Sequence, residues 1–307
     1  MTGISCDGKR CFSYCPDNVK CLLRYPAAFI MCEIMTERII EIKDLKIPEL
    51  AVYKERSEIQ LLHINEPAAG IFICESAKVI RRALDAGYEP ISVLTSIGDP
   101  DEEVREIFEL CKNVPIYYGS DSVLREIAGY ALTGGILSAM RRKPLPDISD
   151  VIRDKKLIAV LENVQNPTNV GSIFRSAAAM GVEAVILTSD SSDPLYRRAE
   201  RVSMGNVFLV DWTIMDKEID YVSLLAEEGF ATVAMALSDN SVSITDPRIK
   251  AEKKLAIILG NEGYGLRQET IQSCKYTARI PMKPGVDSLN VGAASSVMFW
   301  ELVRDRL

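Results

Sequence analysis

Short apolar segments alternate with helical patterns along most of this 307-residue chain, and this alternation limits the folds that it can adopt. The second half of the chain contains six such segments. They are residues 157–161, 184–188, 207–210, 231–236, 255–259 and 278–282. Because strands that alternate with helices form mostly parallel sheets, this half is predicted to be a complete α/β domain.

The first half repeats the alternation on a smaller scale, between residues 70 and 140. Residues 141–156 follow, and their two prolines and three aspartates are typical of a linker. We therefore expect a small α/β domain at 35–143, a linker at 144–156 and a second domain at 157–307. Residues 1–34 form an extension of unknown role.

The eight cysteines fall into two groups. Four are scattered and are typical of small core residues. The other four crowd the first 21 residues, at Cys6, Cys11, Cys15 and Cys21. Their spacing lacks the C-x2-C pair typical of zinc sites, so we predict no metal. Three interpretations of this segment remain: a metal site, a disordered leader, or translated sequence upstream of a true start at Met35.

The composition is that of an ordinary globular protein, with 48% hydrophobic and 26% charged residues. No stretch approaches the roughly 20 consecutive apolar residues of a membrane span, so we expect a cytoplasmic protein without a membrane partner. The formal net charge of -7 argues mildly against a nucleic-acid partner, but local clusters decide such binding. The candidate residues for it are Arg141, Arg142, Arg197, Arg198 and Arg201.

A glycine-rich turn, Gly260 to Gly265, follows the apolar segment 255–259. Open α/β sheets bind ligands at the carboxyl ends of their strands, so this turn is a candidate ligand site. It matches neither the dinucleotide fingerprint nor the phosphate loop. Glu262 would repel a phosphate, which favours a nucleoside with free hydroxyls or a cationic ligand. An ordinary glycine turn is the alternative.

A second polar motif, residues 166–175, lies between an apolar segment and a helical pattern. We expect Asn169 to be the N-cap of this helix. Arg175 follows in a helix of otherwise small and apolar residues, where an unpaired guanidinium is costly to bury. Its partner is either an acidic side chain, in a structural salt bridge, or the phosphate or carboxylate of a ligand.

The chain has one histidine, His63, in its first half. The second half therefore has no Ser-His-Asp triad, no Cys-His pair and no histidine-rich metal site. Any catalysis there depends on other polar side chains.

Four motifs in the second half resemble, in order, those of the SpoU/TrmH family, which are RNA ribose 2′-O-methyltransferases of the SPOUT class. They are N-x-x-N-x-G-S-x-x-R at 166–175, the arginine-rich run 193–206, G-N-E-G-x-G at 260–265, and I-P-M with S-L-N-V-G-A-A-S-S-V within 280–297. Together they span residues 157–304. The first domain resembles the family's substrate-binding domain, a ribosomal-protein-like α/β module.

The resemblance implies a deep trefoil knot, bound S-adenosylmethionine and a homodimer with the active site at its interface. It implies a catalytic group of Asn169, Arg175, Glu262, Ser288 and Asn290. It implies a cofactor pocket formed by Leu237, Gly260, Asn261, Gly263, Ile280, Met282, Leu289 and Ala293 or Ala294. The arginines named above become candidates for RNA binding.

Chemistry suggests roles for three of these residues. Glu262 would offset the positive charge of the cofactor or, with Asn169, orient the ribose hydroxyl. Arg175 is too weak an acid to serve as a base, so we expect it to clamp a phosphate and stabilise the developing alkoxide. Two departures from the family are Gly292, where many relatives carry serine, and Glu200, which adds a negative charge to the arginine-rich run.

We therefore predict an enzyme that methylates ribose in structured RNA, with ribosomal RNA favoured over transfer RNA and no DNA partner. A catalytically inactive RNA-binding or ribosome-assembly protein on the same scaffold is the alternative. A nucleotide-dependent α/β enzyme of another family fails, because both phosphate-binding motifs are absent from the sequence.

Overall fold

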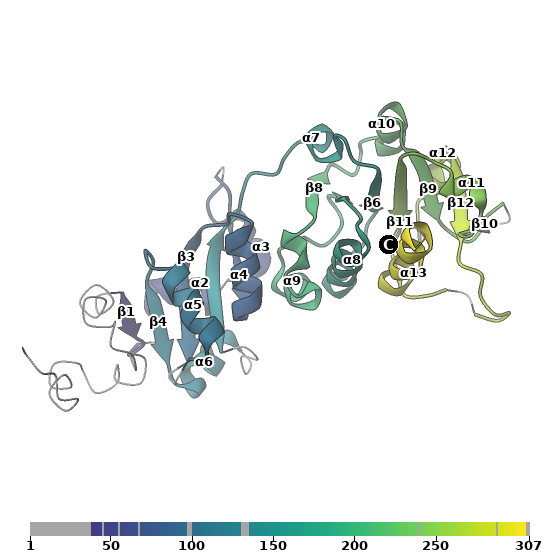
Figure 1. The fold of residues 1–307 in the computed structure, drawn as a ribbon. Coiled ribbons are helices and arrows are strands. Elements are labelled where there is room, and N and C mark those ends of the chain that lie inside the picture. The colour runs from purple at the N-terminus through teal and green to yellow at the C-terminus, as the bar shows by residue number, and fades with distance from the viewer. Residues whose placement is uncertain are drawn as a thin grey trace, which may run out of the picture.

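The computed structural model describes residues 38–304, except 45, 55, 67, 97–99, 130–134, 239 and 287. The four crowded cysteines, and with them the questions of a metal site and of Met35, lie outside the described residues. Figure 1 shows two sheets, each flanked by helices. Within the described ranges, no helix is long and apolar enough to span a membrane, and histidine, cysteine and acidic side chains form no metal-binding cluster.

The first sheet has five strands in the order β1-β4-β3-β5-β2. They are β1 (Ile39–Glu41), β2 (Ile71–Glu75), β3 (Pro90–Ser96), β4 (Ile116–Gly119) and β5 (Ile136–Arg141). The β1–β4 and β3–β4 pairs are parallel, whereas β5 runs antiparallel to both β2 and β3. The sheet is therefore mixed, with β5 as its one reversed strand among those described.

Helices cover both faces of the first sheet. They are η1 (Pro48–Leu50), α2 (Ala51–Lys54), α3 (Glu58–His63), α4 (Ala77–Asp85), α5 (Glu102–Leu110) and α6 (Asp121–Ala128). Successive side chains of a strand point to opposite faces. Accordingly, Ile71 and Ile73 of β2 pack with the cores of α2, α3 and α6, while Phe72 and Cys74 pack with those of α4 and α5.

The second sheet has seven strands in the order β10-β12-β9-β11-β6-β7-β8, and every pair is parallel. They are β6 (Leu157–Leu161), β7 (Ala184–Thr188), β8 (Asp211–Met215), β9 (Ala231–Met235), β10 (Val242–Ser243), β11 (Leu255–Leu259) and β12 (Tyr276–Arg279). All residues of β6, β7 and β11 are buried, which explains their continuous apolar sequences. The expected α/β fold with a parallel sheet is thus confirmed for this half.

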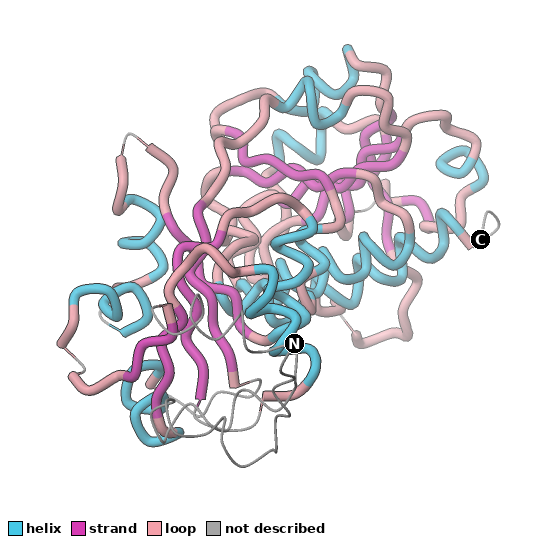
Figure 2. The backbone as a smooth tube through the Cα atoms, turned by 60° about the vertical axis from the view of Figure 1, so that its left-hand side comes forward, coloured by secondary structure: helices cyan, strands magenta, loops and turns pink. Residues whose placement is uncertain are grey.

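Helices also cover both faces of the second sheet, whose strands are magenta in Figure 2. They are α7 (Ile148–Ile152), α8 (Pro167–Met180), α9 (Arg197–Ser203), η2 (Asn206–Phe208), α10 (Tyr221–Glu227), α11 (Pro247–Lys250), α12 (Gln268–Ser273) and α13 (Val291–Val303). The core of α8, α9 and α13 includes Ala159 and Ile257, and the core of α7 and α10 includes Ile158 and Ile258.

Several elements differ from the sequence-based expectation. Residues 207–210 were expected as a strand, but η2 ends at Phe208 and β8 begins only at Asp211. Val207 is fully buried there, and periodicity alone does not distinguish so short an apolar run from a helical turn. The chain also forms β10 and α11, which were not expected, and the segment 144–156 contains α7, whose Val151 and Ile152 are buried.

The two sheets share one hydrophobic core, because α9 and η2 of the second half pack against β2 and α4 of the first. Phe208 contacts the rings of Phe72 and Tyr88, with centroid distances of 6.1 and 5.3 Å. Arg82 of α4 donates to the carbonyl of Met204 at 2.7 Å and also to the side chain of Asn206. We call this contact the domain interface.

Candidate active site

The turn from Gly260 to Gly265 begins where β11 ends. A Cβ on Gly260 would lie 2.6 Å from the backbone of Gly265 and Leu266, so this position requires glycine. The backbones of Asn261 and Gly265 pair across the turn at 2.9 and 3.1 Å. The turn therefore closes on itself, and Glu262 is exposed within it.

The side chain of Asn261 fixes the turn from inside. Its Oδ1 accepts hydrogen bonds from the backbone N–H groups of Gly263 and Tyr264, at 2.8 and 3.0 Å. Its Nδ2 donates to the carbonyl of Asn163, just after β6, at 2.8 Å. Asn261 thus holds the turn against the neighbouring strand.

Helix α8 begins one turn earlier than expected. Asn166 is the N-cap and its side chain accepts from the backbone N–H of Thr168 at 2.9 Å, while Pro167 occupies the first helical position. The expectation that Asn169 is the N-cap is therefore wrong. Asn169 lies inside the helix and is 5% exposed, so its amide needs partners other than the helix backbone.

Those partners come from two other segments. The Nδ2 of Asn169 donates to Oε1 of Glu262 at 2.5 Å, and the Nδ2 of Asn290 donates to Oδ1 of Asn169 at 2.9 Å. Asn290 is the N-cap of α13, where its Oδ1 accepts from the backbone N–H of Gly292 at 2.9 Å. Because that oxygen must accept, both amide orientations follow from the network. We call Glu262, Asn169 and Asn290 the carboxylate–amide network.

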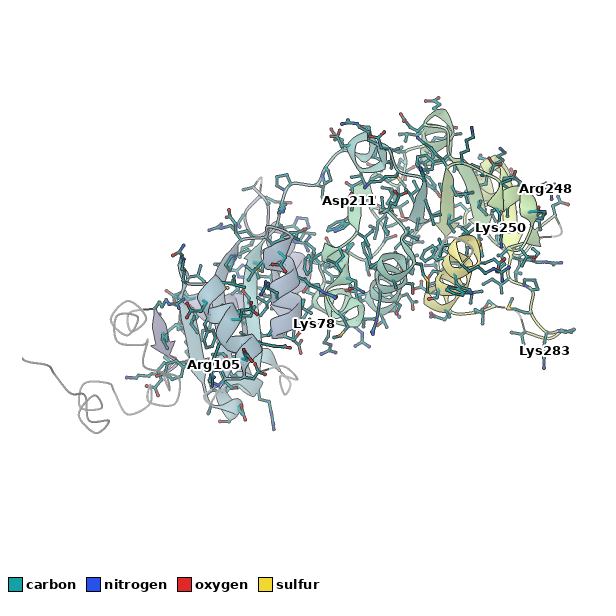
Figure 3. All side chains as sticks on the ribbon, viewed as in Figure 1. Lys78, Arg105, Asp211, Arg248, Lys250 and Lys283 are labelled. Atoms are coloured by element: carbon teal, nitrogen blue, oxygen red, sulfur yellow. The ribbon has the colours of Figure 1, made fainter. Side chains whose placement is uncertain are left out.

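A cavity of about 570 Å³ lies beside this network, at the carboxyl ends of β9, β11 and β12. Four separate stretches line it: residues 235–237, residues 259–266, Gln268 with Ile271 of α12, and residues between 278 and 294. Eight of the residues expected to bind a cofactor line it, namely Leu237, Gly260, Asn261, Gly263, Ile280, Met282, Leu289 and Ala294. Ala293 does not line it. Figure 3 labels Lys283 on the loop that carries Met282 and Ser288.

The expected catalytic residues divide into two groups. Glu262, Ser288 and Asn290 line the cavity, and Asn169 reaches it through its hydrogen bonds. Arg175 is exposed on α8, and within the described residues it makes no hydrogen bond or ion pair. The structural salt bridge considered for Arg175 is therefore not found within the described chain.

Helices α8 and α13 pack closely beside the network. A Cβ on Gly292 would lie 3.0 Å from the Cβ of Ser172, so a serine there requires the two helices to separate slightly. The hydroxyls of Ser176 and Ser296 lie 2.6 Å apart. The lack of a side chain at Gly292 thus allows the two helices to pack closely at this position.

The arginines expected to bind RNA have different environments. Arg141 and Arg198 are exposed, and Nε of Arg198 donates to Oγ1 of Thr168 at 2.7 Å. Arg201 lies 3.5 Å from the buried carboxylate of Glu75, and the backbone N–H of Arg197 donates to Glu58.

Arg142 requires a correction. Its guanidinium is 7% exposed and donates two hydrogen bonds to Asp193, at 2.8 and 3.1 Å, inside the domain interface. A buried bidentate ion pair leaves no donor directed at a phosphate in solution.

The expectation for Glu200 also requires a correction. Its side chain is 1% exposed, and burial raises the pKa of its carboxyl well above the usual value. It therefore adds no exposed negative charge to the arginine-rich run. It lies beside the thiol of Cys74, and burial likewise raises the pKa of that thiol.

The residues predicted to form the site did not include three polar or aromatic residues that line the cavity: Tyr264, Gln268 and Arg279. Gln268 begins α12 and Arg279 ends β12. Their positions at the ends of a helix and a strand are the sequence feature that could have indicated a place in the cavity. Tyr264 is the variable residue of the G-N-E-G-x-G motif and is 93% exposed.

The fold and cavity define an α/β protein with a cavity of small-molecule size at the carboxyl ends of its parallel strands, where such folds bind their ligands. Residues 156–300 match the model of the SpoU rRNA methylase family. An uncharacterized tRNA/rRNA methyltransferase of Mycobacterium bovis is 32% identical over 260 residues, which cover 84% of this chain and 89% of the relative. The chain belongs to the SpoU family of RNA methyltransferases, as its motifs predicted.

Other relatives and solved structures are also similar to this chain. The 23S rRNA (guanosine-2′-O-)-methyltransferase RlmB of Acinetobacter baylyi is 29% identical over 229 residues, covering 71% of this chain and 92% of that protein. The AdoMet-bound rRNA methyltransferase of Sinorhizobium meliloti has a similar fold, with a TM-score of 0.74, 23% identity, and coverage of 88% and 99% of the two chains. The SpoU methyltransferase AviRb of Streptomyces viridochromogenes, also solved with AdoMet, gives a TM-score of 0.70 at 21% identity, covering 85% of this chain and 99% of that chain.

Proposed function

We propose that this protein transfers a methyl group from S-adenosylmethionine to a ribose 2′-hydroxyl of structured RNA, with ribosomal RNA as the favoured substrate. The observation that carries the proposal is the carboxylate–amide network at the edge of the 570 Å³ cavity, formed by three segments far apart in sequence. Membership of the SpoU family supports the reaction. We place the reaction in the cytoplasm, as the sequence suggested.

The cavity suits S-adenosylmethionine. Its volume falls in the range of about 300–1,000 Å³ that is usual for small-molecule sites. Leu237, Ile280, Met282 and Leu289 supply apolar walls. Glu262 supplies a carboxylate, which suits a sulfonium cation and disfavours a phosphate-bearing cofactor. When bound, this cofactor supplies an electrophilic methyl group.

The residues of the network prepare the ribose hydroxyl. Asn169 occupies Oε1 of Glu262 and leaves Oε2 able to accept the proton of a hydroxyl placed beside the cavity. Asn290 fixes the amide of Asn169 and is itself fixed by the first turn of α13. Arg175, exposed and without a partner in the described chain, is available for the adjacent phosphate and the developing alkoxide.

We further propose a homodimer that uses the exposed face of α8 and α13. Val297 and Trp300 of α13 are 39% and 49% exposed although both are large and apolar. Large apolar side chains exposed on one helix are typical of interaction surfaces. A second copy on this face would enclose Arg175 at the interface, and two-fold symmetry would give two equivalent sites.

Two structural proposals complete this picture. The convergence of separate stretches between residues 235 and 294 on one cavity, together with the position of β11 between β9 and β6, supports a trefoil knot in residues 157–307. We also propose that residues 35–143 form the RNA-binding domain.

The test uses the purified protein, labelled S-adenosylmethionine and total RNA, followed by alkaline digestion. A 2′-O-methylated ribose resists alkali, so we expect a labelled dinucleotide. The Glu262→Gln variant is expected to form at least tenfold less product, because the carboxylate is lost. Release of all the label as mononucleotides would refute ribose methylation, and retained cofactor binding without transfer would favour the inactive RNA-binding protein.

A further inference from the structure

Two charged side chains are found among the residues that line the 570 Å³ cavity, which we call the cofactor cavity. One is Glu262 of the carboxylate–amide network, and the other is Arg279, the last residue of β12. All other lining residues are apolar or neutral. The proposed function uses the carboxylate of Glu262 and leaves the guanidinium of Arg279 without a role.

The backbone at Arg279 is held between two neighbouring strands. Ser243 of β10 is its register partner, and the carbonyl of Arg279 accepts from the backbone N–H of Ile244 at 3.0 Å. On the other side, Ala278 pairs with Met235 of β9. The side chain of Arg279 therefore starts from a fixed point at the edge of the cavity.

The pleat of β12 gives the direction of this side chain. Ala278 packs in the core of α8 and α13, and successive side chains of a strand point to opposite faces. Arg279 therefore points to the face of the sheet that α12 covers, where Gln268 and Ile271 also line the cavity. Glu262 is bonded to α8, on the other face. The two charged groups thus approach the cavity from opposite sides.

The guanidinium of Arg279 is available to a ligand. Arg279 is exposed, and within the described residues it makes no hydrogen bond or ion pair. Two carboxylates between β10 and β11 already have cations of their own, since Asp246 pairs with Arg248 and Glu252 pairs with Lys275, each at 2.7 Å. The planar fork of donors on an arginine matches the two oxygens of a carboxylate.

The spacing of the two charges suits the methionine part of S-adenosylmethionine. Strands β12 and β11 lie on either side of β9, so their ends are about 10 Å apart, or two strand spacings. Glu262 and Arg279 extend into this space from its two sides. In the cofactor, three carbons separate the sulfonium from the carboxylate, and a chain of that length fits between the two side chains.

We propose that Arg279 binds the carboxylate of the methionine part of S-adenosylmethionine, with Glu262 beside the sulfonium. This inference rests on the proposed function, because it assigns a residue to that cofactor. Paired N–H···O bonds from a guanidinium to a carboxylate are among the stronger hydrogen bonds in proteins and also fix orientation. Arg279 thus makes the cavity selective for an adenosine ligand with a free carboxylate, and it holds the methionine chain in one orientation.

Decarboxylated S-adenosylmethionine tests this assignment, because it keeps the sulfonium and the amine and lacks the carboxylate. Calorimetry measures the binding of both compounds to the full-length protein without RNA. We expect the wild type to bind S-adenosylmethionine about 10-fold to 100-fold more tightly than the decarboxylated compound. Arg279→Gln should reduce this preference to less than about twofold, by weakening the binding of S-adenosylmethionine.

Two further variants serve as controls. Arg279→Lys keeps the charge but loses the planar fork, so it should retain part of the preference. Arg153→Gln removes an exposed arginine at the C-cap of α7 and should bind both compounds as the wild type does. Thermal unfolding without ligand checks the fold of each variant, and the midpoint should stay unchanged because Arg279 is exposed and unpaired in the described chain.

The outcomes separate this inference from the proposed function. A carboxylate preference that depends on Arg279, in a protein that transfers no methyl group to RNA, supports the assignment and refutes the function. Equal binding of the two compounds by the wild type, or an unchanged preference in Arg279→Gln, overturns the assignment and leaves methyl transfer standing. A variant that loses only RNA affinity also overturns it and makes Arg279 an RNA contact. No binding of S-adenosylmethionine up to about 10 mM overturns both.

Discussion

Two polar clusters of this protein have opposite environments. At the domain interface, Arg142 and Asp193 are each 7% exposed and are joined by two hydrogen bonds from Nη1 and Nη2 of Arg142. In the carboxylate–amide network and on α8 beside it, Glu262 and Arg175 are exposed. The charges of Arg142 and Asp193 pair with each other inside the protein, whereas those of Glu262 and Arg175 are accessible to a ligand.

The difference shows which charged motif residues hold the fold and which are available for chemistry. A buried ion pair is costly to break because the remaining charge has no partner and no water. An exposed charge beside a cavity costs little to keep and is available to a substrate. Charge alone therefore does not identify a functional arginine, whereas burial and partners do. The following predictions test this contrast, beginning with the largest expected effect.

The largest effect is expected from Asp193→Ala. The substitution leaves the buried guanidinium of Arg142 unpaired, and it also removes the acceptor for the backbone N–H of Leu195 at 2.7 Å. We expect the free energy of unfolding to fall by about 3–5 kcal/mol. Urea unfolding followed by fluorescence and by circular dichroism measures it.

The double variant Arg142→Met, Asp193→Leu is the control. It removes both charges and keeps apolar volume, so it should recover a large part of the lost stability. A loss below about 1 kcal/mol in the single variant would show that the pair is solvated, and the contrast between the two clusters would then fail.

The next effect is expected from Arg175→Ala, and it concerns activity alone. Loss of one group that stabilises a transition state typically lowers kcat by about 100-fold to 1,000-fold. Because Arg175 is exposed and has no partner in the described chain, stability should change by less than about 0.5 kcal/mol. Single-turnover methyl transfer, cofactor titration and thermal unfolding measure the three quantities.

Arg153→Ala, which removes an exposed arginine at the C-cap of α7, is the control and should leave turnover unchanged. Arg175→Lys keeps the charge but loses the planar fork, so it should recover only part of the activity. Normal turnover by Arg175→Ala would remove the proposed role.

The sequence predicted the parts of the site that local patterns encode. The glycine turn follows directly after a buried strand, and Asn290 directly precedes a helix, so both could be located without a structure. Pro167 could also have indicated where α8 begins, because proline favours the first helical position. That position makes Asn166, and not Asn169, the N-cap.

What the sequence could not show depends on distant contacts. Arg141 and Arg142 are adjacent and identical in type, yet only Arg142 is buried, against a residue 51 positions away. Glu200 was expected to add a negative charge to the arginine-rich run, but the packing of α9 against β2 buries it. No local periodicity distinguishes these cases, because the opposing surface comes from another domain.

A smaller effect is expected from Glu200→Gln, and it depends on pH. Burial raises the pKa of Glu200, so above its unfolded value of about 4.3 the native state binds more protons than the unfolded state. Wild-type stability is therefore fully present at low pH and falls as pH rises toward the folded pKa. The fall is at most about 1.4 kcal/mol per pH unit.

Glutamine does not titrate, so the variant should gain stability over the wild type as pH rises from about 5 to 8. Thermal unfolding at several pH values measures this gain, and Glu227→Gln, an exposed carboxylate of α10, controls for the general effect of charge. A gain that is equal at all pH values would contradict a raised pKa of the buried Glu200 carboxyl.

The smallest effect compares the two adjacent arginines directly. Arg141→Ala removes an exposed cation and, where Arg141 contacts a phosphate of the RNA, should lower the slope of log affinity against log salt by about 0.7–0.9. Arg142→Met in the double variant removes a cation that is already neutralised by Asp193, so that slope should stay unchanged. RNA binding at several salt concentrations measures both slopes. An equal change in the two variants would show that the domain interface opens when RNA binds, because only then does Arg142 reach a phosphate.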